Sequence, residues 1–253
     1  MTIILATSNM HKIREFQAML GDKNARIYAY EEILKPLHIV ENGATFAENA
    51  ALKAKAIYNA FYTQYTQEKE QSDLVFPLAL IAEDSGICIP ALGGEPGIYS
   101  ARYAQYKGFK RDSQNLREHG EQRDLHLTHN STDTMNLHCL IKQIAPFAPT
   151  PAFFVANIAL IYSESSTLPP LQECVIEHFE GRLDGIAIGE ARGSQGFGYD
   201  PLFVPNTDNP LQKTLAELEP SVKNMLSHRK KAISLCIKRL NMEKSESALD
   251  SIK

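Results

Sequence analysis

The feature that most constrains the fold is an almost uninterrupted apolar run at residues 153–162 (FFVANIALIY). A run of this length, rich in branched and aromatic residues, predicts a buried strand near the centre of a sheet. Two shorter apolar runs, at residues 2–7 (TIILAT) and 78–82 (LALIA), are too short for helices and also predict buried strands. The fold must therefore contain a buried sheet.

Helical patterns alternate with these strands. Residues 11–20 carry apolar side chains at helical spacing, and Thr45 with Glu48 fits a capping box ahead of an alanine-rich helix to about residue 65. Helices are also expected at 135–144 and over most of 214–241, and strands at 174–188 and 202–204. Because strands and helices interleave, the expected fold class is α/β.

Composition excludes several classes of function. The 253 residues carry a net charge of −4, so no basic excess attracts a nucleic-acid backbone, and no apolar run approaches the length of a membrane span. Four cysteines at long intervals, without a CxxC pair, indicate free thiols in a reducing compartment. The N-terminus lacks the pattern of a signal peptide. We expect a cytoplasmic protein without nucleic-acid or membrane partners.

Two segments are expected to lie outside the compact domain. Residues 105–134 balance basic against acidic side chains and show no apolar periodicity, which predicts an exposed polar insertion. Residues 242–253 predict a flexible C-terminal tail. The rest of residues 1–241 is then expected to form a single domain.

The first candidate site is the polar loop between the strand at 2–7 and the next helix. Backbone N–H groups at a helix N-terminus, short hydroxyls and one lysine can together bind an anion. The alternative is an ordinary N-cap followed by a surface lysine. The chain has no GxxxxGK[ST] sequence, so this loop is not a P-loop. Its residues are Thr7, Ser8, Asn9, Met10, His11 and Lys12.

The second candidate site is the acidic sequence Glu83-Asp84-Ser85-Gly86, expected at the end of the strand at 78–82. Ligands of open α/β sheets bind at the carboxyl ends of strands, and Mg²⁺ favours carboxylate oxygens. A solvated turn is the alternative. Glu41 is a possible second metal ligand.

Two further sites lie in the C-terminal third. Residues 193–201 (GSQGFGYDP) place glycines around two aromatic rings and an acid, so that the backbone can approach a flat ligand while a ring stacks on it. Lys223 and Ser227 share a face if one helix continues through them. Otherwise Ser227 caps a new helix, whose first turn carries His228 and Arg229. A glycine-rich loop and a solvated basic face are the structural alternatives.

The ordered set of motifs resembles the family of inosine/xanthosine triphosphate pyrophosphatases. The matching blocks are ATSN-x-x-K, E-x-G-x-TF-x-EN, EDSG, ALGG-x-PG-x-YSARYA, GFGYDP and KN-x-x-SHR-x-KA, from residue 5 to about 235. The resemblance implies a long, mixed, twisted sheet with flanking helices, in two lobes around a central active-site cleft. It also implies a Mg²⁺-dependent homodimer that hydrolyses deaminated purine nucleoside triphosphates to the monophosphate and pyrophosphate.

The resemblance also implies roles for individual residues. Glu41 and Asp84 correspond to the magnesium ligands, and Asp84 also to the proton acceptor. Substrate-binding positions correspond to the loop from Thr7 to Lys12, to Lys53 and Arg102 near the phosphates, and to Ser85, Phe197, Gly198, Tyr199, Asp200, Lys223, His228 and Arg229. Glu83 stands where an aspartate is commoner, and Met10-His11 where small residues are common.

The implied reaction is attack of water on the α-phosphorus with pyrophosphate as the leaving group. Asp84 could deprotonate the water or act mainly as a metal ligand, and the sequence leaves both roles open. Two other functions are alternatives: a pyrophosphatase of modified pyrimidine nucleotides on a related fold, and a non-catalytic nucleotide-binding module. The SHR and GFGYD blocks argue against the first, and the presence of both Glu41 and Asp84 argues against the second.

Overall fold

The computed structural model describes residues 1–7, 9–20, 25–67, 75–109, 130–165, 167–207 and 209–250. In this part of the chain six strands form one mixed sheet in the order β2-β1-β3-β4-β5-β6. Strand β1 runs parallel to β2 and β3, and β5 pairs antiparallel with β6. The strands are β1 (Thr2–Leu5), β2 (Arg26–Ala29), β3 (Leu78–Cys88), β4 (Thr150–Ser163), β5 (Ile176–Ala187) and β6 (Phe203–Pro205).

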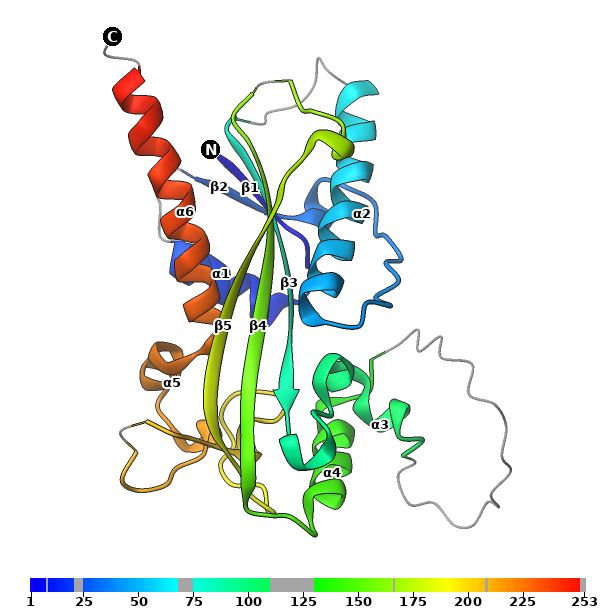
Figure 1. Ribbon diagram of the computed structural model, residues 1–253, viewed down its shortest axis with the longest axis vertical. Coiled ribbons are helices and arrows are strands. Elements are labelled where there is room, and N and C mark those ends of the chain that lie inside the picture. The colour runs from blue at the N-terminus through cyan, green and yellow to red at the C-terminus, as the bar shows by residue number, and fades with distance from the viewer. Residues whose placement is uncertain are drawn as a thin grey trace. The chain divides into compact units, whose positions relative to one another are not determined.

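Six α-helices accompany the sheet in the described residues (Figure 1). Their bounds are α1 (Met10–Leu20), α2 (Phe46–Gln67), α3 (Tyr103–Tyr106), α4 (Asp133–Ile144), α5 (Pro220–Leu226) and α6 (His228–Asp250). The expected α/β class is therefore confirmed. Within the described residues, no helix is both long and apolar enough to cross a membrane.

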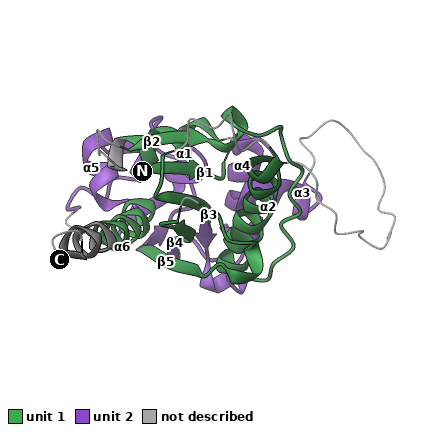
Figure 2. Cartoon of the chain, turned by 90° about the horizontal axis from the view of Figure 1, so that it is seen from above, with its two compact units in different colours: residues 1–84, 156–182, 228–253 green, residues 85–155, 183–227 purple. Residues whose placement is uncertain are grey.

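The chain divides into two compact units, coloured separately in Figure 2. Unit 1 comprises residues 1–84, 156–182 and 228–253, and unit 2 comprises residues 85–155 and 183–227. Three of the four boundaries between the units fall inside strands β3, β4 and β5, and the fourth lies between Ser227 and His228.

Unit 1 buries its strands on both faces. Along β1, Ile3 packs in one apolar cluster with helices α1 and α6, while the next residue, Ile4, packs in a second cluster with α2. Side chains alternate between the two faces of a strand, so a continuous apolar run satisfies both clusters. Figure 1 shows α1 and α6 on one side of the strands and α2 on the other.

Unit 2 has its own apolar core around helices α3 and α4. Tyr103 of α3, Leu140 of α4 and Phe154 of β4 are buried in it with Phe203 of β6. The rings of Phe154 and Phe203 meet edge to face, 4.8 Å between centroids. This geometry is the one that aromatic quadrupoles favour.

Most expected elements are present, with changes at their ends. The apolar run at 153–162 forms β4, which lies between β3 and β5. The helix after Thr45 begins at Phe46, with the Glu48 backbone N–H donating to Thr45 Oγ1. Strand β2 was not expected from the sequence.

One expectation about local structure is wrong, and one open alternative is decided. The acidic sequence from Glu83 to Gly86 does not follow a strand but lies inside β3, which continues to Cys88. For residues 223–229 the structure has the second of the two alternatives: α5 ends at Leu226 and a new helix, α6, begins at His228, so His228 and Arg229 lie in its first turn. Ser227 lies between them with extended backbone angles (φ −51°, ψ 127°), which breaks the helix.

The ends of the expected insertion at 105–134 belong to helical elements. Gln105 lies in α3, and Thr132 caps α4 by accepting the Met135 backbone N–H. Residues 110–129 lie outside the described residues. At the C-terminus, α6 continues through the expected tail as far as Asp250. The sequence there contains neither glycine nor proline, so nothing in it interrupts a helix.

Candidate active site

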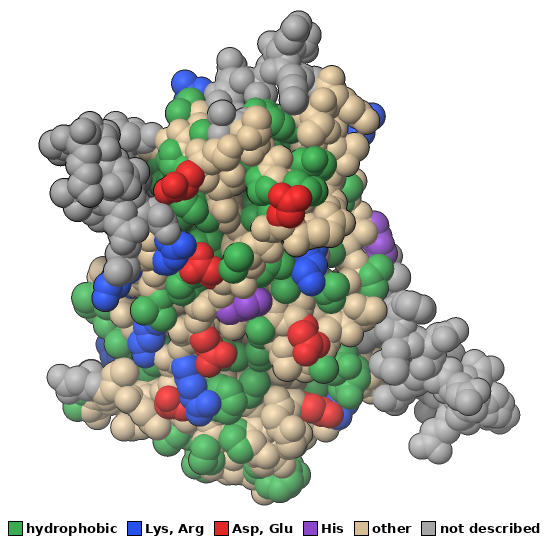
Figure 3. All heavy atoms as spheres, turned by 45° about the horizontal axis from the view of Figure 1, so that its top comes forward, with side chains coloured by type: hydrophobic (Ala, Val, Ile, Leu, Met, Phe, Trp, Pro, Cys, Tyr) green, Lys and Arg blue, Asp and Glu red, His purple; other side chains and the backbone are tan. Residues whose placement is uncertain are grey.

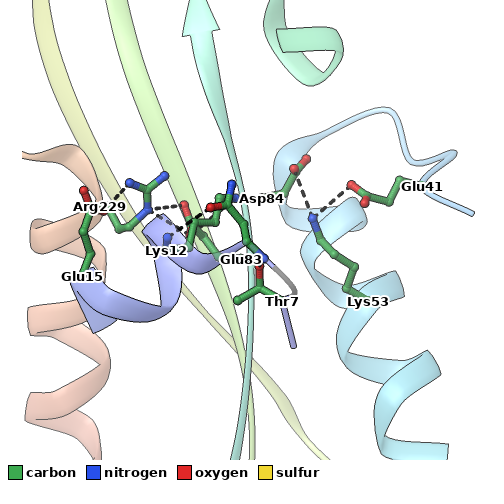
Figure 4. Close-up of polar contacts among 9 residues, drawn as sticks. Thr7, Lys12, Glu15, Glu41, Lys53, Glu83, Asp84 and Arg229 are labelled. Carbon is green, nitrogen blue, oxygen red and sulfur yellow. Dashed lines mark hydrogen bonds and ion pairs between the residues drawn. The ribbon is translucent and has the colours of Figure 1, made fainter. Parts of the chain in front are cut away.

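Two consecutive acids of β3 serve opposite faces of the sheet in unit 1. Glu83 contacts α1 and α6, whereas Asp84 contacts α2, as successive side chains of a strand must. Figure 4 shows the two carboxylates and the cations around them. Both acids are almost completely buried. Buried charges require partners, so the contacts of each acid decide what the site can do.

On the α2 face, Lys53 joins two carboxylates. Its Nζ lies 3.0 Å from Glu41 Oε2 and 3.3 Å from Asp84 Oδ1. Asn49, one helical turn before Lys53, donates to Asp84 Oδ2 at 3.1 Å and accepts the Gly43 backbone N–H at 2.9 Å. The structure thus brings together Glu41, Lys53 and Asp84, the three residues assigned to metal and phosphates.

The pKa values on this face reflect burial and charge. Burial raises the pKa of Asp84, although Lys53 and Lys12 act in the opposite direction. For Lys53, burial alone would lower the pKa, but Asp84 and Glu41 outweigh it and the pKa is raised. The lysine therefore stays an ammonium between the two carboxyl groups.

On the opposite face, Glu83 is the centre of an ion-pair network. Arg229 Nε donates to both Glu83 oxygens, at 2.9 and 3.0 Å, and Arg229 Nη1 donates to Glu15 Oε2. Lys12 Nζ lies 3.6 Å from Glu83 Oε2. Burial lowers the pKa of Lys12 despite the charge of Glu83. Glu83, the departure from the commoner aspartate, thus connects α1 and α6 to β3.

Glycine in β5 lets α6 approach closely enough for this network. A Cβ at Gly181 would lie 2.0 Å from the His228 carbonyl oxygen and 2.6 Å from the Ala232 nitrogen. No other residue fits such contacts with backbone atoms. Lys231 Nζ also donates to the Arg182 carbonyl at 2.7 Å. These contacts fix the position of the first turn of α6 along β5. That turn carries the half-buried His228 and the buried Arg229.

The N-terminal loop caps α1. Thr7 Oγ1 accepts the Asn9 backbone N–H at 3.1 Å, and Asn9 Oδ1 accepts that of Lys12 at 3.3 Å. Met10 is 56% exposed, in agreement with an outward-facing side chain. Ser8 and the His11 side chain lie outside what the structure describes.

In unit 2, the glycine loop (residues 193–200) folds around Asp200. Asp200 Oδ2 accepts the Phe197 backbone N–H at 2.8 Å and pairs with Lys223 Nζ at 2.6 Å, and the same ammonium lies 4.9 Å from the centroid of the Phe197 ring. Gly196 has φ +84°, and a Cβ there would lie 2.2 Å from Asp200 Oδ2. Phe197, Asp200 and Lys223 therefore form one cluster.

The remaining predicted residues of unit 2 are placed separately. Tyr199 is buried and its hydroxyl donates to the Ser100 carbonyl at 2.8 Å. The Arg102 guanidinium lies over the Tyr99 ring, 5.6 Å from its centroid. Ser85 is half-buried in β3.

Three polar residues of these clusters were missed by sequence reasoning. They are Glu15, Asn49 and Asp133, which bind Arg229, Asp84 and Gly198 respectively. Helical spacing could have indicated two of them, because Glu15 follows Lys12 by three residues and Asn49 precedes Lys53 by four. Asp133 carried no comparable signal.

These features define an α/β protein with a candidate site for an anionic, phosphate-bearing ligand. Residues 3–239 match the Ham1 family, and the chain belongs to that family. It is 53% identical over 249 residues to a dITP/XTP pyrophosphatase of Helicobacter hepaticus, covering 95% of this chain and 98% of that one. A dITP/XTP pyrophosphatase of Sulfurovum is 38% identical over 248 residues, covering 97% and 96%.

Solved structures agree with this placement. The Ham1 protein of Staphylococcus aureus has a TM-score of 0.68 at 29% identity, covering 96% of this chain and 100% of that chain. A HAM1 protein from Coxiella burnetii gives the same TM-score and identity, covering 96% and 99%.

Proposed function

We propose that the protein hydrolyses the deaminated purine nucleoside triphosphates ITP, dITP and XTP to the monophosphate and pyrophosphate. It thereby removes them from the nucleotide pool before their incorporation into DNA or RNA. The Lys53 ammonium between Glu41 and Asp84 is the observation that carries this proposal, together with the names of the relatives. Balanced acid and lysine groups suit a ligand that brings both phosphates and a divalent cation.

The donor set fits Mg²⁺. In the described residues, no group of three or more His, Cys, Asp or Glu side chains could hold a metal. Two carboxylates, Glu41 and Asp84, suit an ion that takes its other ligands from water and phosphate oxygens. When bound, the ion supplies positive charge at the phosphates. We propose these two acids as its ligands.

Residues of unit 1 would then act on the triphosphate. Lys12 and Lys53 supply positive charge to phosphate oxygens, with the N–H groups at the start of α1. Asp84, held by Asn49, orients the attacking water and accepts its proton at a carboxylate oxygen.

Base recognition is proposed for Phe197, Gly198, Tyr199, Asp200 and Lys223 of unit 2 and, separately, for His228 and Arg229 of unit 1. Hypoxanthine and xanthine present a 6-oxo acceptor where adenine has an amino donor, so a fixed donor at that edge opposes adenine. Guanine must be rejected at C2, where a donor accepts the 2-oxo group of xanthine and opposes a 2-amino group. One such mismatch is worth about 10–100-fold.

Pyrophosphate release from ITP, dITP and XTP, with Mg²⁺ and with EDTA, tests the function. Release from all three that requires Mg²⁺ is expected. Release confined to modified pyrimidine triphosphates would support the related pyrophosphatase instead, and ITP binding without release would support a non-catalytic module.

Location and assembly are also proposals. We propose a cytoplasmic homodimer, on the strength of the family resemblance and the free cysteines. Light scattering on a sizing column should give twice the 28.2 kDa chain mass. On the face in Figure 3, acidic and basic side chains are interspersed, as expected for an ordinary protein surface.

A further inference from the structure

The first turn of α4 contacts two different substrate-binding segments of unit 2. Asp133 Oδ2 accepts the Gly198 backbone N–H of the glycine loop at 2.9 Å. Three residues later, Asn136 Nδ2 donates to the Ala101 carbonyl at 3.0 Å and Asn136 Oδ1 accepts the Ala104 backbone N–H at 2.9 Å. Residues three apart share one face of a helix, so a single turn of α4 reaches both segments.

Asn136 fixes the backbone on both sides of Arg102. Its side chain is buried, with 2% of the residue exposed, and its amide bonds Ala101 and Ala104. The segment of residues 100–104, named here the arginine segment, is therefore held by an amide that must both donate and accept. A buried amide with both functions satisfied tolerates little displacement of its partners.

A third contact joins the two segments directly. Tyr199 Oη donates to the Ser100 carbonyl at 2.8 Å, in a buried position. The three hydrogen bonds therefore form a closed ring. Helix α4 bonds the glycine loop at Gly198 and the arginine segment at Ala101, and Tyr199, next to Gly198, bonds Ser100, next to Ala101. Asp200, which follows Tyr199, fixes the Phe197 backbone N–H and Lys223. A closed set of hydrogen bonds sets the distance between the arginine segment and the glycine loop.

We propose that Asp133 and Asn136 are positioning residues, which hold the glycine loop and Arg102 in the arrangement that binds and selects the nucleotide. This inference rests on the proposed function. Misplacement of binding groups by about 1 Å can cost on the order of 100-fold in rate, so loss of either contact matters even though neither side chain touches the reacting atoms.

Four variants, two at Asp133 and one each at Thr132 and Asn136, separate positioning from support of the helix. Asp133→Ala removes the acceptor for Gly198, whereas Asp133→Asn keeps an acceptor oxygen. Thr132→Ala is the matched control, because Thr132 caps the same helix through Met135. Each protein is assayed for kcat and KM with ITP and GTP well below its melting temperature. Hydrogen exchange of a peptide covering residues 195–200 is measured in parallel.

Asp133→Ala is expected to raise KM for ITP about 3–10-fold and to lower the ITP-over-GTP selectivity by a similar factor. Exchange of the glycine loop should become faster. Asp133→Asn should recover most of both effects, and Thr132→Ala should change neither despite a lower melting temperature. Asn136→Asp, which keeps the acceptor and loses the donor, should raise KM like Asp133→Ala.

The inference is overturned if Asp133→Ala and Thr132→Ala show the same KM, selectivity and exchange. It is also overturned if exchange of the glycine loop rises while KM and selectivity stay at wild-type values. The proposed function fails in a different way, because wild-type protein would then release no pyrophosphate from ITP.

Discussion

Glu83 and Asp84 are neighbours in β3, yet their carboxylates bind cations on opposite faces of the sheet. Glu83 pairs with Arg229 of α6 and Lys12 of α1, while Asp84 pairs with Lys53 of α2. Arg229, which pairs with Glu83, is buried. Lys53, which pairs with Asp84, also pairs with Glu41. Substitutions of the two acids should therefore have different consequences.

Asp84→Asn should abolish most turnover while the protein stays folded. Loss of a general base or metal ligand costs on the order of 10²–10⁴ in rate. The isosteric amide has one acceptor oxygen and no charge, so it keeps either the contact with Lys53 or the contact with Asn49. Pyrophosphate release from ITP and a thermal melt measure the two effects. A kcat near the wild-type value would refute the role assigned to Asp84.

Arg229→Ala should lower stability by about 3–5 kcal/mol, because Glu83 and Glu15 lose their buried partner. Arg239→Ala is the matched control on α6, since its ion pair with Glu177 is 30% exposed on both sides and contributes at most about 1 kcal/mol. Urea unfolding measures both variants. Equal losses in the free energy of unfolding would mean that the buried ion pairs of Arg229 stabilise the protein no more than the exposed pair of Arg239.

Arg229→Ala should also lower kcat/KM for ITP and XTP more than for GTP, if Arg229 reads the base as well as holding Glu83. Steady-state kinetics on the three substrates, on protein kept folded at low temperature, measure this ratio. Equal losses on all three would assign Arg229 to the phosphates or to the fold.

Replacing residues 110–129 by a short Gly-Ser linker should leave a folded, active enzyme. The segment balances its charges and carries few apolar residues, and loop-closure free energy changes only slowly with length. Deletion of residues 108–132 should lower the melting temperature more. It also removes Phe109, whose ring lies under the Lys142 ammonium, and the Thr132 cap of α4. Melting temperatures compare the two. A large drop for the shorter deletion would contradict the expectation of an exposed insertion.

Stability should fall above pH 8.5 partly through Cys236. Burial, with a smaller effect of Glu177, raises the pKa of this thiol to about 12. In the unfolded chain a cysteine thiol has a pKa of about 8.5. The unfolded state therefore loses its proton first, so the stabilisation present below pH 8.5 is lost as pH rises toward 12. At pH 10 the loss is about 2 kcal/mol. Urea unfolding of wild type and Cys236→Ala should show the smaller pH dependence in the variant, and equal slopes would contradict the prediction.

The sequence was sufficient for most of the local elements. The run at 153–162 had to form a buried strand, and Thr45 had to begin a helix, because these depend on side-chain periodicity and on contacts three or four residues away. The motifs likewise selected Lys53 and Asp84. Strand β2 was missed because its four residues form a strand only through pairing with β1.

Tertiary structure alone decided which partner each charge has. Glu15 and Arg229 are separated by 214 positions, and Asp133 and Gly198 by 65, so no local pattern relates them. The register of β3 sends Glu83 to one face and Asp84 to the other, and the approach of α6 to Gly181 determines how far Arg229 reaches. Local sequence determines propensity and chemistry, whereas the pairing of buried charges depends on long-range packing, which places each carboxylate within reach of its cation.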